Sequence, residues 1–213
     1  MQAIERVVID NSWITILLVC LFACVFLLRG LSAVRLKGSV SSLFNESFID
    51  SEIEENSSFF NPFKNIVFIF SIVVLSLLAY KIYLYYNSTA EEGFFTFLKV
   101  LGVVFSYLTF KRLLEFLFSV VFKIDKKLDF FLVSKSVYLY SVSFFLLIAI
   151  VLVEYSKLNT LFLVYFSVLL FSIRFIFHAV INKKLVFSEL FYFILYLCAF
   201  EIAPLFILFR LLF

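Results

Sequence analysis

The strongest constraint on this chain is the recurrence of hydrophobic stretches long enough to cross a bilayer. The first uncharged stretch runs from Asn11 to Leu28, with Trp13 near one end and Arg29 after the other. One membrane-spanning helix needs about 20 apolar residues, and aromatic and basic residues gather at membrane interfaces. A cleaved signal peptide is the alternative, but acidic residues precede the stretch and no small-residue cleavage site follows it. The stretch therefore predicts a transmembrane helix.

Composition extends this interpretation to the whole chain. Of the 213 residues, 64% are hydrophobic and 15% are charged, and the mean hydropathy is +1.12. A soluble domain carries about 25% charged residues, so this chain has too little polar surface for a water-soluble fold. We expect an all-α, polytopic transmembrane helical bundle that forms a single transmembrane domain over residues 1–213. The expected spans are residues 12–29, 62–86, 94–112, 134–154, 158–181 and 185–211.

The end of the third helix is left open by the sequence. Lys99 lies inside this helix, and charged residues follow from Lys111 onwards. In one interpretation the span ends near Phe110 and residues 113–124 lie along the membrane interface. In the other, a tilted helix continues to Phe122.

Positive charge is distributed unequally between the two sides of the expected bundle. Most of the 18 Lys and Arg residues fall in the first, third and fifth connections. Cytoplasmic loops retain Lys and Arg, so these connections are expected in the cytoplasm. With six spans, both termini then lie on the non-cytoplasmic side.

The longest connection, residues 30–60, is expected to be a cytoplasmic loop with a basic start and an acidic second half. Its apolar residues recur at roughly helical spacing, which suggests an amphipathic helix on the membrane or against the bundle. These residues are Leu43, Phe44, Phe48, Ile49 and Ile53. A solvated connector is the alternative, and a docking site for a basic partner is the functional interpretation.

Charged residues inside the spans are the main candidates for function, because an ionised side chain near mid-bilayer costs about 2.5 to 3.5 kcal/mol on insertion scales. Glu201 lies three residues before Pro204 in an otherwise apolar stretch. Pro204 has no N–H to donate to the carbonyl of Phe200. This local polar spot suits a proton, a cation or a partner's side chain, and a protonated Glu201 bonded to a neighbouring helix is the structural alternative.

A second group of candidates lies near the turn between the last two spans. Arg174 and His178 are four residues apart and share a helical face. Glu189 is expected at a depth similar to that of Arg174, so we predict an Arg174–Glu189 pair that His178 helps to join. Catalysis by His178 is the alternative.

Three further charged residues lie on the third helix. Lys99 is expected either to snorkel to the outer interface or to pair with Glu154 or Glu201. Lys111 and Glu115 have the spacing of an intrahelical ion pair.

A polar stripe follows helical spacing on the fourth span, at Ser134, Tyr138 and Ser141. Such a stripe joins helices more often than it lines a pore.

Several classes of function are disfavoured by the sequence. The basic residues make no footprint for nucleic acid, and three cysteines in apolar stretches with one histidine suggest neither a metal site nor a cofactor. A catalytic set of nucleophile, base and stabiliser is also not evident. The spacing of His178 and Asn182 resembles one motif of glutamate-type intramembrane proteases, but the paired Glu91 and Glu92 lack the accompanying arginine. We therefore expect a protein that is not an enzyme.

Three short segments resemble a domain-of-unknown-function family of small multi-spanning membrane proteins from Bacteroidetes. They are the tail from Leu195 to Leu205, the membrane entry Trp13-Ile14-Thr15 and the pair Lys111-Arg112. The resemblance implies a bacterial inner (cytoplasmic) membrane location and supplies no established activity. It also suggests an accessory role in an envelope machine such as the secretion or gliding apparatus.

Together these observations predict a non-enzymatic membrane protein that acts as a scaffold or accessory subunit of a cell-envelope complex. Its environment is the lipid bilayer, and its partners are other membrane proteins. Glu201 and the loop after Gly30 are the candidate contact sites. The alternative is a small proton- or ion-coupled transporter or channel subunit that uses Glu201.

Overall fold

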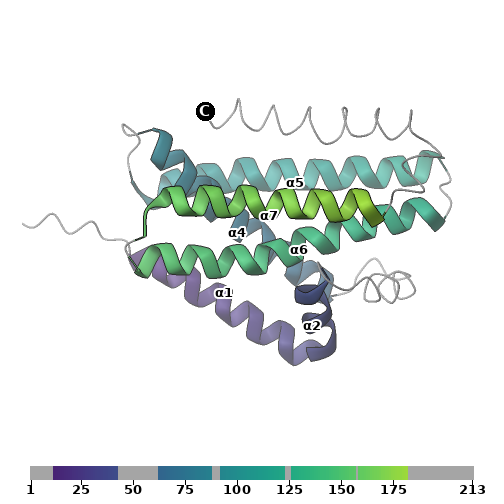
Figure 1. The fold of residues 1–213 in the computed structure, drawn as a ribbon, viewed down its shortest axis with the longest axis horizontal. Coiled ribbons are helices and arrows are strands. Elements are labelled where there is room, and N and C mark those ends of the chain that lie inside the picture. Colours follow the sequence, from purple (N-terminus) through teal and green to yellow (C-terminus); the bar gives the residue numbers. More distant parts are fainter. Residues whose placement is uncertain (1–11, 43–61, 88–91, 123–125, 157, 182–213) are drawn as a thin grey trace, which may run out of the picture.

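The computed structural model describes residues 12–42, 62–87, 92–122, 126–156 and 158–181. They form six helices and no strand, which confirms the predicted all-α fold (Figure 1). The helices are α1 (Ser12–Leu31), α2 (Ala33–Ser41), α4 (Pro62–Tyr86), α5 (Phe94–Phe122), α6 (Lys126–Tyr155) and α7 (Thr160–Ile181).

Five of these helices are long and apolar enough to cross a membrane. The apolar lengths are Ser12–Leu31, Pro62–Tyr86, Phe94–Leu114, Val133–Tyr155 and Thr160–Phe177. They correspond to the first five expected spans. The sixth expected span, residues 185–211, lies outside the described residues, as does the amphipathic pattern of residues 43–53.

Local sequence signals explain where several helices begin. Pro62 occupies the first position of α4, where its missing N–H leaves no hydrogen bond unmade. The hydroxyl of Ser32 accepts a hydrogen bond from the backbone N–H of Arg35 at 3.3 Å and caps α2. The side-chain oxygen of Asn159 accepts one from the N–H of Leu161 at 3.2 Å at the start of α7.

Two elements extend beyond the expected boundaries. α5 is one continuous helix to Phe122 and does not end near Phe110, and α6 begins at Lys126, well before residue 134. The 29 residues of α5 make a helix about 44 Å long, whereas the hydrocarbon core of a bilayer is about 30 Å thick. The α5–α6 hairpin is therefore longer than a single membrane crossing.

The helices alternate in direction, and specific contacts show how their ends meet. Near the start of α1, Trp13 packs against Tyr80 near the end of α4 and Phe97 near the start of α5. Thr15 also contacts Tyr155 at the end of α6. We call this the Trp13 end of the bundle. At the opposite end, which we call the α2 end, α1 stops, α4 and α6 begin, and α5 and α7 finish (Figure 1).

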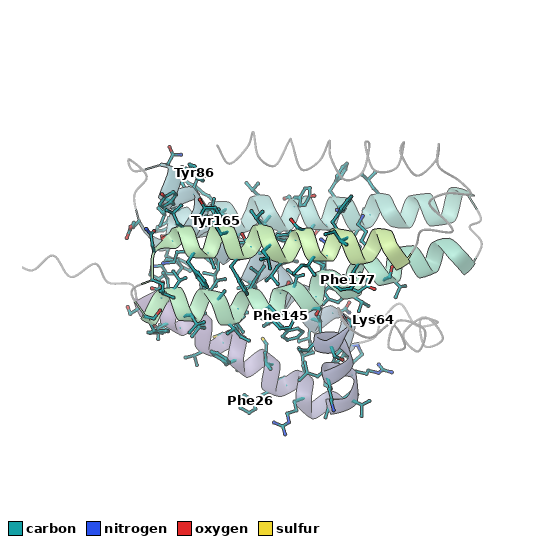
Figure 2. All side chains as sticks on the ribbon, viewed as in Figure 1. Phe26, Lys64, Tyr86, Phe145, Tyr165 and Phe177 are labelled. Atoms are coloured by element: carbon teal, nitrogen blue, oxygen red, sulfur yellow. The ribbon has the colours of Figure 1, made fainter. Side chains whose placement is uncertain are left out.

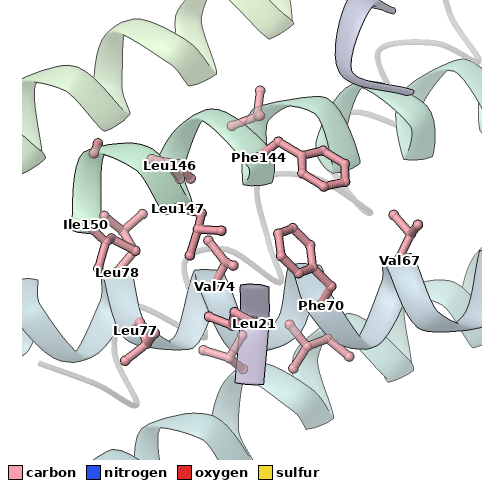
Figure 3. Close-up of a cluster of buried hydrophobic side chains, with 14 of the residues drawn as sticks. Leu21, Val67, Phe70, Val74, Leu77, Leu78, Phe144, Leu146, Leu147 and Ile150 are labelled. Atoms are coloured by element: carbon pink, nitrogen blue, oxygen red, sulfur yellow. The ribbon is translucent and has the colours of Figure 1, made fainter. Parts of the chain in front are cut away.

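The core lies between α4 and α6. In these helices 50% and 61% of the apolar length is buried, compared with 22%, 22% and 17% in α1, α5 and α7. The rings of Phe70 and Phe144 stack with centroids 4.8 Å apart at the centre of the α4–α6 contact. Leu21 of α1 reaches the same cluster (Figure 3). The other three spanning helices therefore surround a two-helix centre.

Candidate functional site

An ion pair joins the two central helices at the Trp13 end. Lys81 Nζ of α4 lies 2.7 Å from Glu154 Oε2 of α6, and the two side chains are only 18% and 14% exposed. Because charged groups are costly to place in lipid, pairing allows both to stay close to the membrane. The contact fixes the relative depth of α4 and α6.

Aromatic side chains surround this end of the bundle. The Trp13 ring lies 5.4 Å from the Tyr80 ring and 5.3 Å from the Phe97 ring, measured between centroids. The Tyr80 hydroxyl accepts a hydrogen bond from the backbone N–H of Gly93 at 3.2 Å, just before α5 begins. The cluster thus holds α1, α4 and α5 together at the depth where Trp and Tyr are enriched in membrane proteins.

At the α2 end, Arg174 connects α7 to α6. Its Nη2 atom donates a hydrogen bond to the backbone carbonyl of Lys135 at 3.1 Å. The Lys135 side chain is itself buried, with 5% of the residue exposed. A guanidinium bonded to a carbonyl keeps its charge while satisfying one of its five donors, so this contact serves to join helices.

Two cationic side chains of α5 lie over aromatic rings. The Arg112 guanidinium is 4.7 Å from the centre of the Phe68 ring of α4. Lys111 Nζ is 5.9 Å from the Tyr107 ring of its own helix. A cation over a ring face is stabilised by the ring quadrupole, by about 0.5 to 1 kcal/mol at exposed sites.

One residue of the polar stripe of α6, Ser141, contacts α2. Ser134, Tyr138 and Ser141 are all fully buried. The Ser141 hydroxyl donates a hydrogen bond to the backbone carbonyl of Val40 in α2 at 2.8 Å. Ser39 of α2 and Ser42, which follows its last residue, are buried as well. This contact agrees with the interpretation of the stripe as a helix-joining feature.

Several predicted site residues fall outside what the structure describes. Glu201, Pro204 and Glu189 lie beyond residue 181, and the side chains of His178 and Glu115 are likewise not described. Their proposed roles stay predictions, including the Arg174–Glu189 and Lys111–Glu115 pairs. In the described part of the chain, the partner shown for Arg174 is the Lys135 carbonyl.

For Lys99, the structure shows the surroundings of the residue and of one of its two predicted partners. Lys99 lies on the exposed side of α5. Glu154, one of its two suggested partners, is paired with Lys81 instead.

The Lys81–Glu154 pair and α2 were both missed by the sequence analysis. The ion pair joins residues from two spans that are not consecutive in the chain, so no local spacing marks it. However, Lys81 lies near the end of the second expected span and Glu154 near the end of the fourth, and both ends lie on the same side of the membrane in the expected topology. This similar depth is the sequence signal that could have indicated the pair. For α2, the signal is Ser32, a good N-cap residue placed after Gly30.

Within the described ranges, no group of three or more His, Cys, Asp or Glu side chains lies together as a metal site would require. Most of the polar contacts described above join one helix to another, and apolar side chains form the core.

Five apolar spans, three of them surrounding the α4–α6 centre, define a multi-pass helical membrane protein. The chain belongs to the family described as "Domain of unknown function (DUF4271)", whose model matches residues 14–212. The resemblance to a domain-of-unknown-function family is therefore confirmed. No curated protein and no solved structure matches the chain.

Proposed function

We propose that this protein is a non-enzymatic scaffold or accessory subunit in the inner (cytoplasmic) membrane of a bacterium, where it holds a partner of a cell-envelope complex. The secretion or gliding machinery is the kind of complex that the sequence resemblance suggests. The observation that carries the proposal is the firm attachment of α2 to α6, which gives the polar loop after it a fixed starting point.

α2 is attached to the bundle by apolar packing and by a hydrogen bond. α2 has nine residues, and isolated helices of this length are not stable in water. It is held by the packing of Leu36 and Val40 against the core and by the Ser141–Val40 hydrogen bond. The sequence that follows contains Glu46, Asp50, Glu52, Glu54 and Glu55. A loop of this charge, anchored at its base, suits a basic segment of a partner protein.

The distribution of described cations supports a cytoplasmic location for the α2 end. Arg35, Lys64, Arg112, Lys135 and Arg174 all lie toward this end, where Figure 2 shows Lys64. In the described part of the chain, Lys81 and Lys99 lie toward the Trp13 end. Because positive residues are retained in the cytoplasm, we propose that the Trp13 end faces outward, and with it both termini.

A structural role also fits the chemistry of the described polar groups. A general base or nucleophile must be free to exchange a proton with a substrate. Instead, Glu154 is paired with Lys81, and Ser141 donates to a carbonyl of a neighbouring helix. These contacts support a bundle built to stay fixed in shape.

The test is purification of the native protein in mild detergent, followed by mass spectrometry of what accompanies it. One variant neutralises the loop through Glu52→Gln, Glu54→Gln and Glu55→Gln. A control neutralises Glu92, which lies just before α5 at the Trp13 end, together with the adjacent Glu91 in the sequence. We expect the wild type and the control to retain a stoichiometric partner and the loop variant to lose it.

Two results would contradict the proposal. One is a wild-type protein that purifies as an isolated monomer without partners. The other is ion or proton flux in liposomes that contain only this chain, abolished by Glu201→Gln, because that result supports a transporter.

A further inference from the structure

The side chain of Arg112 reaches from α5 to α4 at the α2 end. Its guanidinium carbon lies 4.7 Å from the centre of the Phe68 ring. Arg112 lies within an unbroken helix, because α5 continues to Phe122 (Figure 1). The helix fixes the backbone of Arg112, and the attraction between a cation and a ring face restrains its side chain. The charge is therefore held at a defined position between the two helices.

Arg112 is also equipped to bind an anion. The side chain is exposed, and contact with a ring leaves N–H donors of the guanidinium available to an oxygen acceptor. Arginine presents these donors in a planar fork that matches two oxygens of a phosphate. An arginine that is already positioned loses little side-chain freedom when it binds. These properties suit an oxyanion ligand.

The depth of Arg112 is that of lipid headgroups. The membrane-spanning part of α5 ends at Leu114, just after Arg112. Arg29 and Arg174 likewise lie within three residues of the ends of the apolar parts of α1 and α7. All three helices finish at the α2 end. Because basic residues gather at the membrane interface, this shared level marks where phosphate groups of the lipid are expected.

An exposed apolar surface continues from Arg112 toward the middle of the membrane. Phe105 lies seven residues earlier, about two helical turns, and therefore on the same side of α5. It is 49% exposed, and Leu98, a further seven residues earlier, is 48% exposed. At about 1.5 Å per residue, Phe105 lies about 10 Å deeper than Arg112, within the roughly 15 Å of hydrocarbon in one leaflet. A cation with apolar side chains beneath it matches the two parts of a phospholipid.

We propose that Arg112, held against Phe68, binds the phosphate of an anionic phospholipid whose acyl chain lies along Phe105. Charge complementarity selects the occupant, because a second cation, Lys111, is adjacent in the chain and its Nζ atom lies 5.9 Å from the Tyr107 ring. Basic residues at the membrane surface attract lipids with a net negative charge. A zwitterionic headgroup carries its own ammonium group and is attracted less. This inference does not depend on the proposed scaffold function.

Native mass spectrometry of the purified full chain in detergent tests the proposal. The protein is titrated with phosphatidylglycerol or with phosphatidylethanolamine of the same acyl chains, and the Kd of the first bound lipid is measured. We expect wild type to bind phosphatidylglycerol more tightly. Arg112→Gln should weaken that binding about fivefold, the contribution of one basic residue near a membrane surface, and leave phosphatidylethanolamine binding unchanged. Arg112→Lys retains the charge without the fork and should lose less.

The matched control is Arg29→Gln. Arg29 is also an exposed arginine at the α2 end, so this variant measures what any such charge contributes. We expect a much smaller loss than in Arg112→Gln. Equal losses in the two variants, or equal binding of the two lipids by wild type, would overturn the proposal. Displacement of phosphatidylglycerol by inorganic phosphate would overturn it in favour of a free phosphate ligand, which makes no use of Phe105.

A crosslinking experiment on the wild type keeps the proposal testable if Arg112→Gln does not fold. The protein is placed in phosphatidylethanolamine vesicles with a small share of phosphatidylglycerol that carries a photoreactive group in its acyl chain. After irradiation, we expect the labelled peptide to contain Phe105, and unlabelled phosphatidylglycerol to compete. Labelling confined to other helices would overturn the proposal, as would equal competition by phosphatidylethanolamine.

Discussion

At the level of single residues, Lys81 and Glu154 show how the bundle accommodates charge near the membrane edge. Their 2.7 Å contact and low exposure mean that each neutralises the other away from water. Removing one partner leaves the other buried and uncompensated, which is more damaging than removing both. The same reasoning applies to Arg174, whose charge is directed at a backbone carbonyl.

We therefore expect Glu154→Gln to lower the free energy of unfolding by about 1.5 to 3 kcal/mol, the range for a hydrogen bond to a charged group. The measurement is thermal unfolding in detergent, followed by size-exclusion chromatography. The exchange Lys81→Glu with Glu154→Lys should restore much of the loss, and Glu92→Gln, at an exposed position, is the control. A Glu154→Gln variant as stable as that control would show that the pair does not hold α4 to α6.

Trp13 is the single tryptophan of the chain and contacts three other rings. Aromatic pairs contribute about 0.5 to 1.5 kcal/mol each beyond the area they bury, so the loss of three pairs in Trp13→Ala should cost roughly 1.5 to 4.5 kcal/mol. Trp13→Phe retains part of the packing and should lose less. The same unfolding assay ranks the two variants, and equal stability of Trp13→Ala and wild type would contradict a structural role for the cluster.

At the level of elements, α2 depends on α6 for its position. The hydrogen bond from Ser141 to the Val40 carbonyl spans two elements, whereas the neighbouring Ser143 donates to Leu139 within its own helix at 2.9 Å. Both serines are fully buried. This pair of residues separates the effect of anchoring α2 from the effect of altering a buried hydroxyl.

Ser141→Ala should increase amide hydrogen exchange in residues 33–41, because α2 loses the hydrogen bond from the Ser141 hydroxyl to the Val40 carbonyl. The expected change in global stability is about 1 kcal/mol. Ser143→Ala should leave exchange in α2 as in the wild type. Equal protection of α2 in the two variants would show that Ser141 does not anchor it.

The elements also show what local sequence can and cannot predict. The predicted span 62–86 coincides with α4 because Pro62 marks its start and a tyrosine cluster marks its end. The continuation of α5 to Phe122 was left open, since charge interrupts its apolar pattern while the backbone continues as a helix. α2 and the Lys81–Glu154 pair depend on contacts between distant segments, which apolar periodicity does not encode. Of the candidate site residues, Arg174 gained a described partner, and Glu201 remains a prediction.

At the level of the whole molecule, the two ends of the bundle have different chemistry. The Trp13 end is aromatic and contains a neutralised ion pair, and the α2 end gathers most of the described cations. This asymmetry supports one orientation in the membrane. In the proposed orientation, α2 lies on the cytoplasmic side of the membrane.

The most direct test of this arrangement is cysteine labelling in intact cells, with Cys20, Cys24 and Cys198 replaced by serine. Asn87→Cys lies at the Trp13 end, and Lys37→Cys lies on α2. A membrane-impermeant maleimide should label Asn87→Cys in intact cells and Lys37→Cys only after the membrane is permeabilised. Labelling of Lys37→Cys in intact cells, with Asn87→Cys protected, would contradict the orientation, and equal labelling of both positions would contradict the membrane crossing itself.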